Sequence, residues 1–95
     1  MKKIKIYELF SASERMTREG GEKLRNILKS ENVTVELDLE NKPLASVSFW
    51  DEGIAKLLLD GWTPAELKKK IQFKDIHPRD LKIVQALMKE RNSDK

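Results

Sequence analysis

The chain has 95 residues, a formal net charge of +3, 39% hydrophobic and 37% charged residues, and no cysteine. This length supports one hydrophobic core, so we expect a single domain over residues 1–91 and a frayed tail over residues 92–95. The lack of cysteine excludes disulfides and thiolate metal sites. The N-terminal residues contain no continuous apolar run, which argues against a signal peptide or membrane span and predicts a soluble, cytoplasmic protein.

Three stretches alternate between apolar and polar residues, the pattern of half-buried strands. They cover residues 4–7, 33–40 and 70–76. The inward side chains of the second stretch are predicted to be Val33, Val35, Leu37 and Leu39. A parallel sheet covered on both faces would show continuous apolar runs, so we expect one buried and one polar face.

Four helical segments lie between or after these strands. They cover residues 17–30 with Thr17 as N-cap, residues 49–60 with Gly61 as the stop, residues 64–69, and residues 77–91. The order β-α-β-α-(α)-β-α predicts a small two-layer α/β domain. If the strands lie in the order 1-2-3, right-handed crossovers place the helices mainly on one face of the sheet.

The most distinctive block is Ser46-Val47-Ser48-Phe49-Trp50-Asp51-Glu52, before and within the second main helix. In a structural interpretation, Ser48 is the N-cap and the two acids complement the positive end of the helix. In a functional interpretation, Ser48 or Ser46 is exposed to a kinase, and its neighbours contact a partner protein. The predicted partner contacts are Phe49, Trp50, Asp51, Glu52 and Trp62.

The segment "VTVELDLENKPLASVSFWDEGIAKLL" resembles the core of the STAS-like domains, a bacterial group related to sulfate-transporter and anti-sigma-factor-antagonist modules. The shared pattern is a strand ending near Asp38, a short connector, and a serine-aromatic-x-acid-acid block that starts at Ser48. The resemblance implies a non-enzymatic regulatory module. It also implies phosphorylation of Ser48, or less directly Ser46, by a kinase-like ATPase that doubles as an anti-sigma factor.

A basic C-terminal third supports a different prediction. Residues 62–95 contain nine Lys and Arg against five Asp and Glu. The predicted nucleic-acid contacts are Lys68, Lys69, Lys70 and Lys74. The alternative functions are therefore a protein-interaction module and a small nucleic-acid-binding protein.

No group of residues forms a convincing catalytic or metal-binding pattern. His77 is the only histidine and is expected to be a cap or turn residue before the last helix. The glycines of "EGGEK" lack the spacing of a phosphate-binding loop and are expected to permit close approach of a helix to the sheet. We therefore expect no enzymatic activity, no cofactor and no metal.

Overall fold

The computed structural model describes residues 1–93 and shows a small α/β domain built on a three-stranded parallel sheet. The strands are β1 (Lys2–Lys5), β2 (Val35–Asp38) and β3 (Ile71–Lys74), in the spatial order β1-β2-β3. The helices are α1 (Ile6–Leu9), α2 (Ala12–Arg15), α3 (Arg18–Ser30), α4 (Val47–Gly53), the 3-10 helix η1 (Ala55–Leu58), α5 (Pro64–Lys70) and α6 (Pro78–Ser93). The predicted fold class is confirmed, and the strands lie in the order 1-2-3 for which helices on one face were expected.

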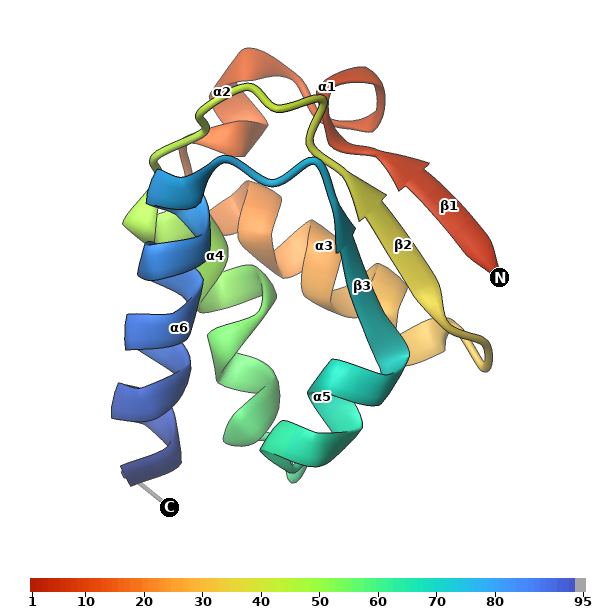
Figure 1. The fold of residues 1–95 in the computed structure, drawn as a ribbon, viewed down its shortest axis with the longest axis vertical. Coiled ribbons are helices and arrows are strands. Elements are labelled where there is room, and N and C mark those ends of the chain that lie inside the picture. Colours follow the sequence, from red (N-terminus) through yellow and green to blue (C-terminus); the bar gives the residue numbers. More distant parts are fainter. Residues whose placement is uncertain (94–95) are drawn as a thin grey trace.

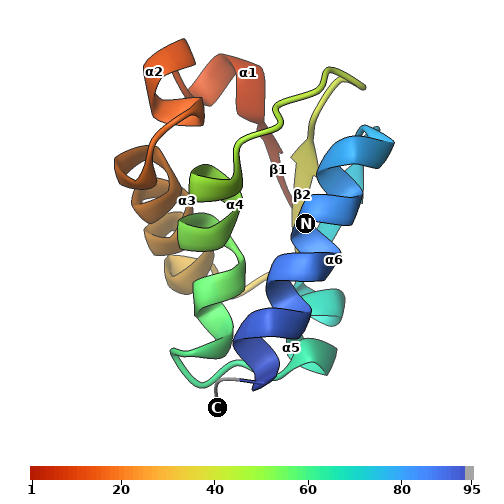
Figure 2. The same ribbon diagram turned by 90° about the vertical axis from the view of Figure 1, so that its left-hand side faces the viewer.

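The helices form one layer and the sheet forms the other, as Figures 1 and 2 show. In Figure 2, α4 and α6 lie toward the viewer from the strands, and α3 lies beside α4. This arrangement follows from right-handed crossovers between parallel strands laid down in sequence order. The side chains of Ile4, Val35, Leu37 and Ile71 are buried against the helices. The prediction of one buried and one polar sheet face is therefore confirmed.

The polar face of the sheet contains two rows of side chains across the strands. The register aligns Lys3, Glu36 and Gln72 in one row and Lys5, Asp38 and Lys74 in the next. Lys74 Nζ lies 4.0 Å from Asp38 Oδ2. This cross-strand charge pairing matches the pattern expected from the alternating sequence.

The N-terminal region differs from its prediction, because β1 ends at Lys5 and α1 begins at Ile6. The alternating pattern predicted that Ile6 faces the core, and Ile6 is fully buried. However, Ile6 belongs to the helix α1 and not to the strand. The short helix α2 was not predicted. Its signal was a capping box, in which the Ser11 side chain accepts a bond from the Glu14 amide and the Glu14 carboxylate accepts one from the Ser11 amide.

The predicted helix over residues 49–60 is two elements, α4 and η1, which are separated at Ile54. Gly53 ends α4, and glycine is the weakest helix former after proline. Gly61 follows with φ of +100°, a conformation that glycine adopts without strain. The predicted helix end was wrong in two respects, because the segment is interrupted at Ile54 and η1 ends at Leu58 with Leu59 as its cap, while Gly61 belongs to the turn that follows.

The other segments follow their predictions closely. Thr17 caps α3, and Thr63 and Glu66 form the capping box of α5. Val33 lies before β2 and is 47% exposed, so its predicted inward position was wrong. Residues 92 and 93 belong to α6 and were wrongly assigned to a frayed tail, while residues 94–95 lie outside the described part of the chain. Within residues 1–93, no helix is long and apolar enough to cross a membrane.

Candidate functional site

The serine block has a different geometry from the predicted one. Ser46, not Ser48, is the N-cap of α4, and its Oγ accepts a 3.2 Å bond from the amide of Phe49. Ser46 is buried, with 5% of its surface exposed. Ser48 lies within the first turn of α4 and is half-buried. The predicted capping role of Ser48 was wrong because the helix begins two residues earlier, at Val47.

The two adjacent aromatic residues of this block lie in the core. Phe49 and Trp50 are fully buried. Their rings form edge-to-face contacts in a row, with Phe10 5.4 Å from Phe49, Phe49 5.4 Å from Trp50, and Trp50 6.1 Å from Phe73. They present no surface to a partner in this structure, which corrects their predicted role. Trp62 is half-buried beside Lys70, whose Nζ lies 5.9 Å from the ring centroid.

Asp51 is buried and forms ion pairs with two arginines from other helices. Arg91 of α6 donates to both carboxylate oxygens, at 2.9 Å and 2.6 Å, and Arg18 of α3 donates at 3.1 Å. The bonds from Arg91, reinforced by Arg18, hold the pKa of Asp51 below its ordinary value against the opposing effect of burial. Asp51 therefore links α3, α4 and α6, and its carboxylate is already occupied.

Glu52 forms the second half of this ion network. Its carboxylate accepts bonds from Arg18 at 3.2 Å, from Arg25 at 3.3 Å and from Lys56. Burial raises the pKa of Glu52, but the bonds and charges of Lys56, Arg18 and Arg25 together lower it below its usual range. The predicted contact surface at Asp51 and Glu52 is therefore an internal joint between helices.

The close contacts of α3 with α2 and with α4 explain the adjacent glycines. A Cβ atom at Gly21 would lie 2.6 Å from the Cβ of Glu52 and 2.7 Å from the carbonyl oxygen of Phe49. A Cβ atom at Gly20 would lie 1.7 Å from the carbonyl oxygen of Glu14. Glycine is needed because helices meet here, and the expectation of a close helix-to-sheet approach was wrong.

Asp80, which the sequence interpretation did not single out, is the most enclosed charged side chain of the described chain. It is fully buried, and its carboxylate accepts bonds from the amides of Leu44 and Ala45 at 2.7 and 2.6 Å and from Trp50 Nε1 at 3.3 Å. Ala45 has φ of +53°, an unfavourable conformation that these bonds stabilise. The "HPRD" stretch at the start of α6 contains no signal for this loop-holding role.

The single histidine has a structural role at the start of α6. The Nδ1 atom of His77 accepts a 3.1 Å bond from the Arg79 amide, which is the cap or turn role expected for it. No three His, Asp or Glu side chains of this region are placed to hold a metal ion. The buried carboxylates are engaged in bonds that stabilise the fold.

The four lysines predicted for nucleic-acid contact take different positions. Lys70 lies over Trp62, and Lys74 stands on the polar sheet face beside Asp38. Lys68 extends over an apolar groove instead. Lys69 is exposed at the end of α5.

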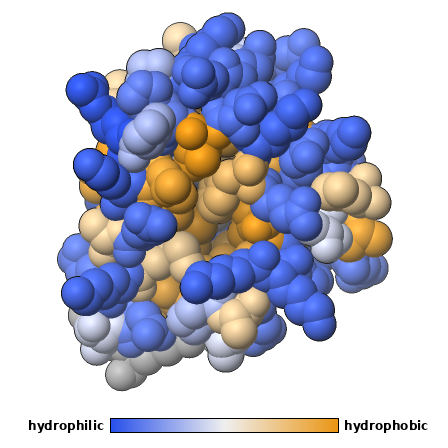
Figure 3. Space-filling model, viewed as in Figure 1, coloured by the Kyte–Doolittle hydropathy of each residue, from blue (hydrophilic) through white to orange (hydrophobic). Residues whose placement is uncertain are grey.

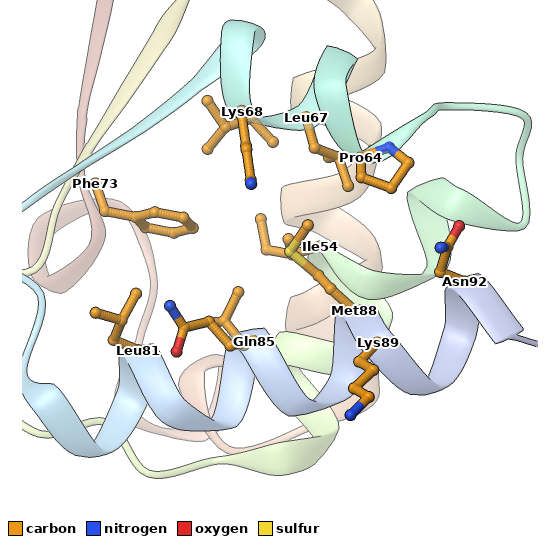
Figure 4. Close-up of a pocket in the computed structure, with 12 residues that line it drawn as sticks. Ile54, Pro64, Leu67, Lys68, Phe73, Leu81, Gln85, Met88, Lys89 and Asn92 are labelled. Atoms are coloured by element: carbon orange, nitrogen blue, oxygen red, sulfur yellow. The ribbon is translucent and has the colours of Figure 1, made fainter.

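This groove lies between α5 and β3 on one side and α6 on the other, with a volume of about 460 Å³. Its apolar lining residues are Ile54, Pro64, Leu67, Ile71, Phe73, Leu81, Val84 and Met88. The Phe73 ring points into the groove in Figure 4, and Figure 3 shows an apolar hollow framed by polar side chains. The volume and lining are in the range of sites that bind small molecules or anchoring side chains.

The polar residues of the groove are either positively charged or neutral. They are Lys68, Gln85, Lys89 and Asn92, and no aspartate or glutamate is among the twelve lining residues. Sequence reasoning missed this site because Leu81, Val84 and Met88 form an ordinary core stripe. Their helix packs mainly on η1 and α4, so the part of the stripe that faces β3 stays uncovered.

Comparisons with family models, curated proteins and solved structures find no match, so the STAS-like resemblance stays a prediction.

Proposed function

We propose that this chain is a non-enzymatic protein-interaction module and that the groove between α5, β3 and α6 receives an apolar segment of its partner. The observation that carries the proposal is the open apolar groove, which leaves Leu81 37% exposed and Phe73 and Met88 half-buried. A continuous apolar hollow with a polar border is typical of an interaction site.

The dimensions of the groove favour a segment of a protein. The α6 residues that line it extend from Leu81 to Asn92. At a rise of 1.5 Å per residue, these positions cover roughly 16 Å along the helix. A site of this length takes two or three successive anchor side chains of a peptide.

The regulatory part of the proposal comes from the STAS-like resemblance. A kinase-like ATPase or anti-sigma factor is the partner that it implies, and Ser48 is the serine that it points to. Ser48 is the better phosphate acceptor of the two candidates, because Ser46 is buried and its hydroxyl holds the Phe49 amide. Mass spectrometry of the chain purified from its own source tests this part: phosphate on Ser48 supports it, and an unmodified chain under all growth conditions removes it.

Nucleic-acid binding stays the alternative prediction, and the positions of Lys68, Lys70 and Lys74 add no support to it. It predicts binding whose logarithmic affinity falls by roughly one unit per phosphate contact for each tenfold rise in salt. A filter-binding or anisotropy titration at several salt concentrations measures this slope.

Selection of displayed random peptides on the full chain tests the interaction proposal. We expect enriched peptides with apolar anchors that bind the wild type and lose at least tenfold in affinity for Leu81→Glu. Leu59→Glu is the matched control, since Leu59 is 46% exposed but does not line the groove. An absence of enriched peptides, or equal binding to both variants, contradicts the proposal.

A further inference from the structure

The edge of the sheet next to the groove is unpaired. Within the described chain β3 is the last strand of the order β1-β2-β3, so only one of its edges is bonded to a neighbouring strand. Figure 1 shows β3 as the strand nearest to α6. An edge strand presents backbone N–H and C=O groups that can bond to an added strand.

Phe73 is the residue whose peptide groups point to that edge. In parallel pairing, the N–H and C=O of one residue face the same neighbour, and successive residues alternate. The Lys74 carbonyl accepts a 3.0 Å bond from the Leu39 amide, so Lys74 faces β2 and Phe73 faces away from it. No cap, turn or side-chain bond within residues 1–93 uses the peptide groups of Phe73.

The neighbouring residue Ile71 is partly engaged. Its N–H donates to the Leu67 carbonyl at the end of α5, and its C=O has the same orientation as the peptide groups of Phe73. The edge therefore offers the carbonyl oxygens of Ile71 and Phe73 as acceptors and the N–H of Phe73 as a donor. The same two residues also line the groove with their side chains, so backbone pairing and side-chain insertion are available to one ligand.

The charges around this edge are positive. Lys68 extends over the groove and Lys89 lies at its border. Lys74 stands on the polar face of β3. The lining residues include no carboxylate, so acidic groups on a ligand meet attraction without repulsion from the groove itself.

We propose that the groove binds an extended acidic peptide, which pairs with Phe73 at the free edge of β3 and inserts alternate apolar side chains between β3 and α6. This inference rests on the proposed function and specifies its partner. Alternate residues of a strand point to opposite faces. One set of peptide side chains therefore enters the groove, and the acidic set faces the polar side of the sheet, where Lys74 stands.

The probe is the synthetic peptide acetyl-Glu-Val-Glu-Leu-Asp-amide, titrated into the full chain by calorimetry at low salt. We expect saturable binding that weakens as salt is added, because the charges at the border are exposed. A peptide with the same composition in which Val and Leu are adjacent keeps the charge but loses the alternation. It is expected to bind at least fivefold more weakly.

Two changes distinguish the contribution of backbone pairing with β3 from the contribution of charge to the affinity for the peptide. N-methylation of the central peptide amides removes the donors that bond to β3 and should weaken binding about fivefold to tenfold. Lys74→Glu, on the polar face of β3, should weaken binding of the unmodified peptide by a similar factor. Lys82→Glu, the same charge change on a residue of α6 that does not line the groove, should have less than a twofold effect.

The outcomes distinguish this inference from the function on which it rests. Unchanged affinity after N-methylation, or a helical signal in the circular dichroism of the bound peptide, overturns strand pairing and leaves the interaction proposal in place. Displayed peptides that bind through Leu81 but carry no acidic residues overturn the charge preference alone. If no peptide of any sequence is enriched and decanoate binds the wild type but not Leu81→Glu, both proposals are overturned and the groove is a fatty-acid site.

Discussion

The two sides of the helical layer differ in how many of their side chains and peptide groups are buried or bonded to other residues. At the contact of α3 with α4, Gly21 allows close helix approach, and the carboxylates of Asp51 and Glu52 are held by cations from α3, α6 and η1. Between α5, β3 and α6, apolar side chains and strand peptide groups remain uncovered. Thus the block that looked reactive in the sequence is a structural joint, and the uncovered apolar surface lies elsewhere.

This contrast shows how a motif can mislead. Serine, aromatic and acidic residues at the start of a helix are typical of a modification site and equally of a cap with buried anchors. Burial decides between the two interpretations for Phe49 and Trp50, which are fully enclosed. The contrast also makes predictions about which changes affect stability and which affect binding alone.

The largest effect on stability is expected for Asp80→Ala. This change leaves the amides of Leu44 and Ala45 and the indole N–H of Trp50 without their acceptor. Each unsatisfied buried donor costs about 1–3 kcal/mol, so we expect a loss of at least about 3 kcal/mol in the free energy of unfolding. Urea denaturation measures it. Glu90→Ala, on an exposed position of α6, is the control, and a similar small change in both variants would contradict the role of Asp80.

Gly21→Ala probes the contact of α3 with α4. The added methyl group meets the Phe49 carbonyl and the Cβ of Glu52 at less than the normal contact distance, so the helices must move apart. Overpacking of this kind costs about 1–3 kcal/mol even though alanine is a better helix former than glycine. Asn26→Ala, on the exposed side of α3, should be neutral in the same denaturation experiment. A stabilised Gly21→Ala protein would show that the helices do not meet here.

Acid should weaken the ion network. The pKa values of Asp51 and Glu52 are lowered in the folded chain, so the unfolded chain binds more protons as the pH drops through the ordinary carboxylate range. The stabilising contribution of both groups is present above about pH 5 and is lost progressively toward about pH 2. Urea unfolding across this range should show a falling free energy of unfolding. The slope should be shallower in Asp51→Asn, and an identical slope would argue against the network.

The smallest effect on stability is expected in the groove. Leu81 is partly exposed, so Leu81→Glu should change the free energy of unfolding by less than about 1 kcal/mol. Thermal unfolding of this variant beside Leu59→Glu checks the prediction. A loss of several kcal/mol for Leu81→Glu alone would mean that Leu81 is a core residue and that its binding defect reports unfolding.

Much of the fold could be predicted because its signals are local. Alternation identified β2 and β3, and the caps at Thr17 and Thr63 marked the starts of helices correctly. Long-range geometry was not predictable in the same way. The bonds of Asp80 join residues 35 and 36 positions apart, and the groove depends on how far α6 stands from β3. The periodicity of apolar residues in the sequence does not predict these bonds or this distance.

The capping error has a similar origin. Ser46 and Ser48 both precede an apolar helix and differ by two residues, and either satisfies the sequence rule for an N-cap. In the structure, the Asp80 carboxylate holds the amides of Leu44 and Ala45 directly before Ser46, and Ser46 is the cap. A rule based on the local sequence does not include this long-range contact.

The most direct test of the account is nitrogen-15 chemical-shift mapping of the full chain with the tightest peptide from the display selection. If the groove is the binding surface, the amides of Phe73, Leu81 and Met88 shift and saturate together, while those of Ser48 and Trp50 change little. Shifts concentrated at Ser48 and Trp50, with the groove amides unchanged, would contradict the account and return the binding site to the serine block.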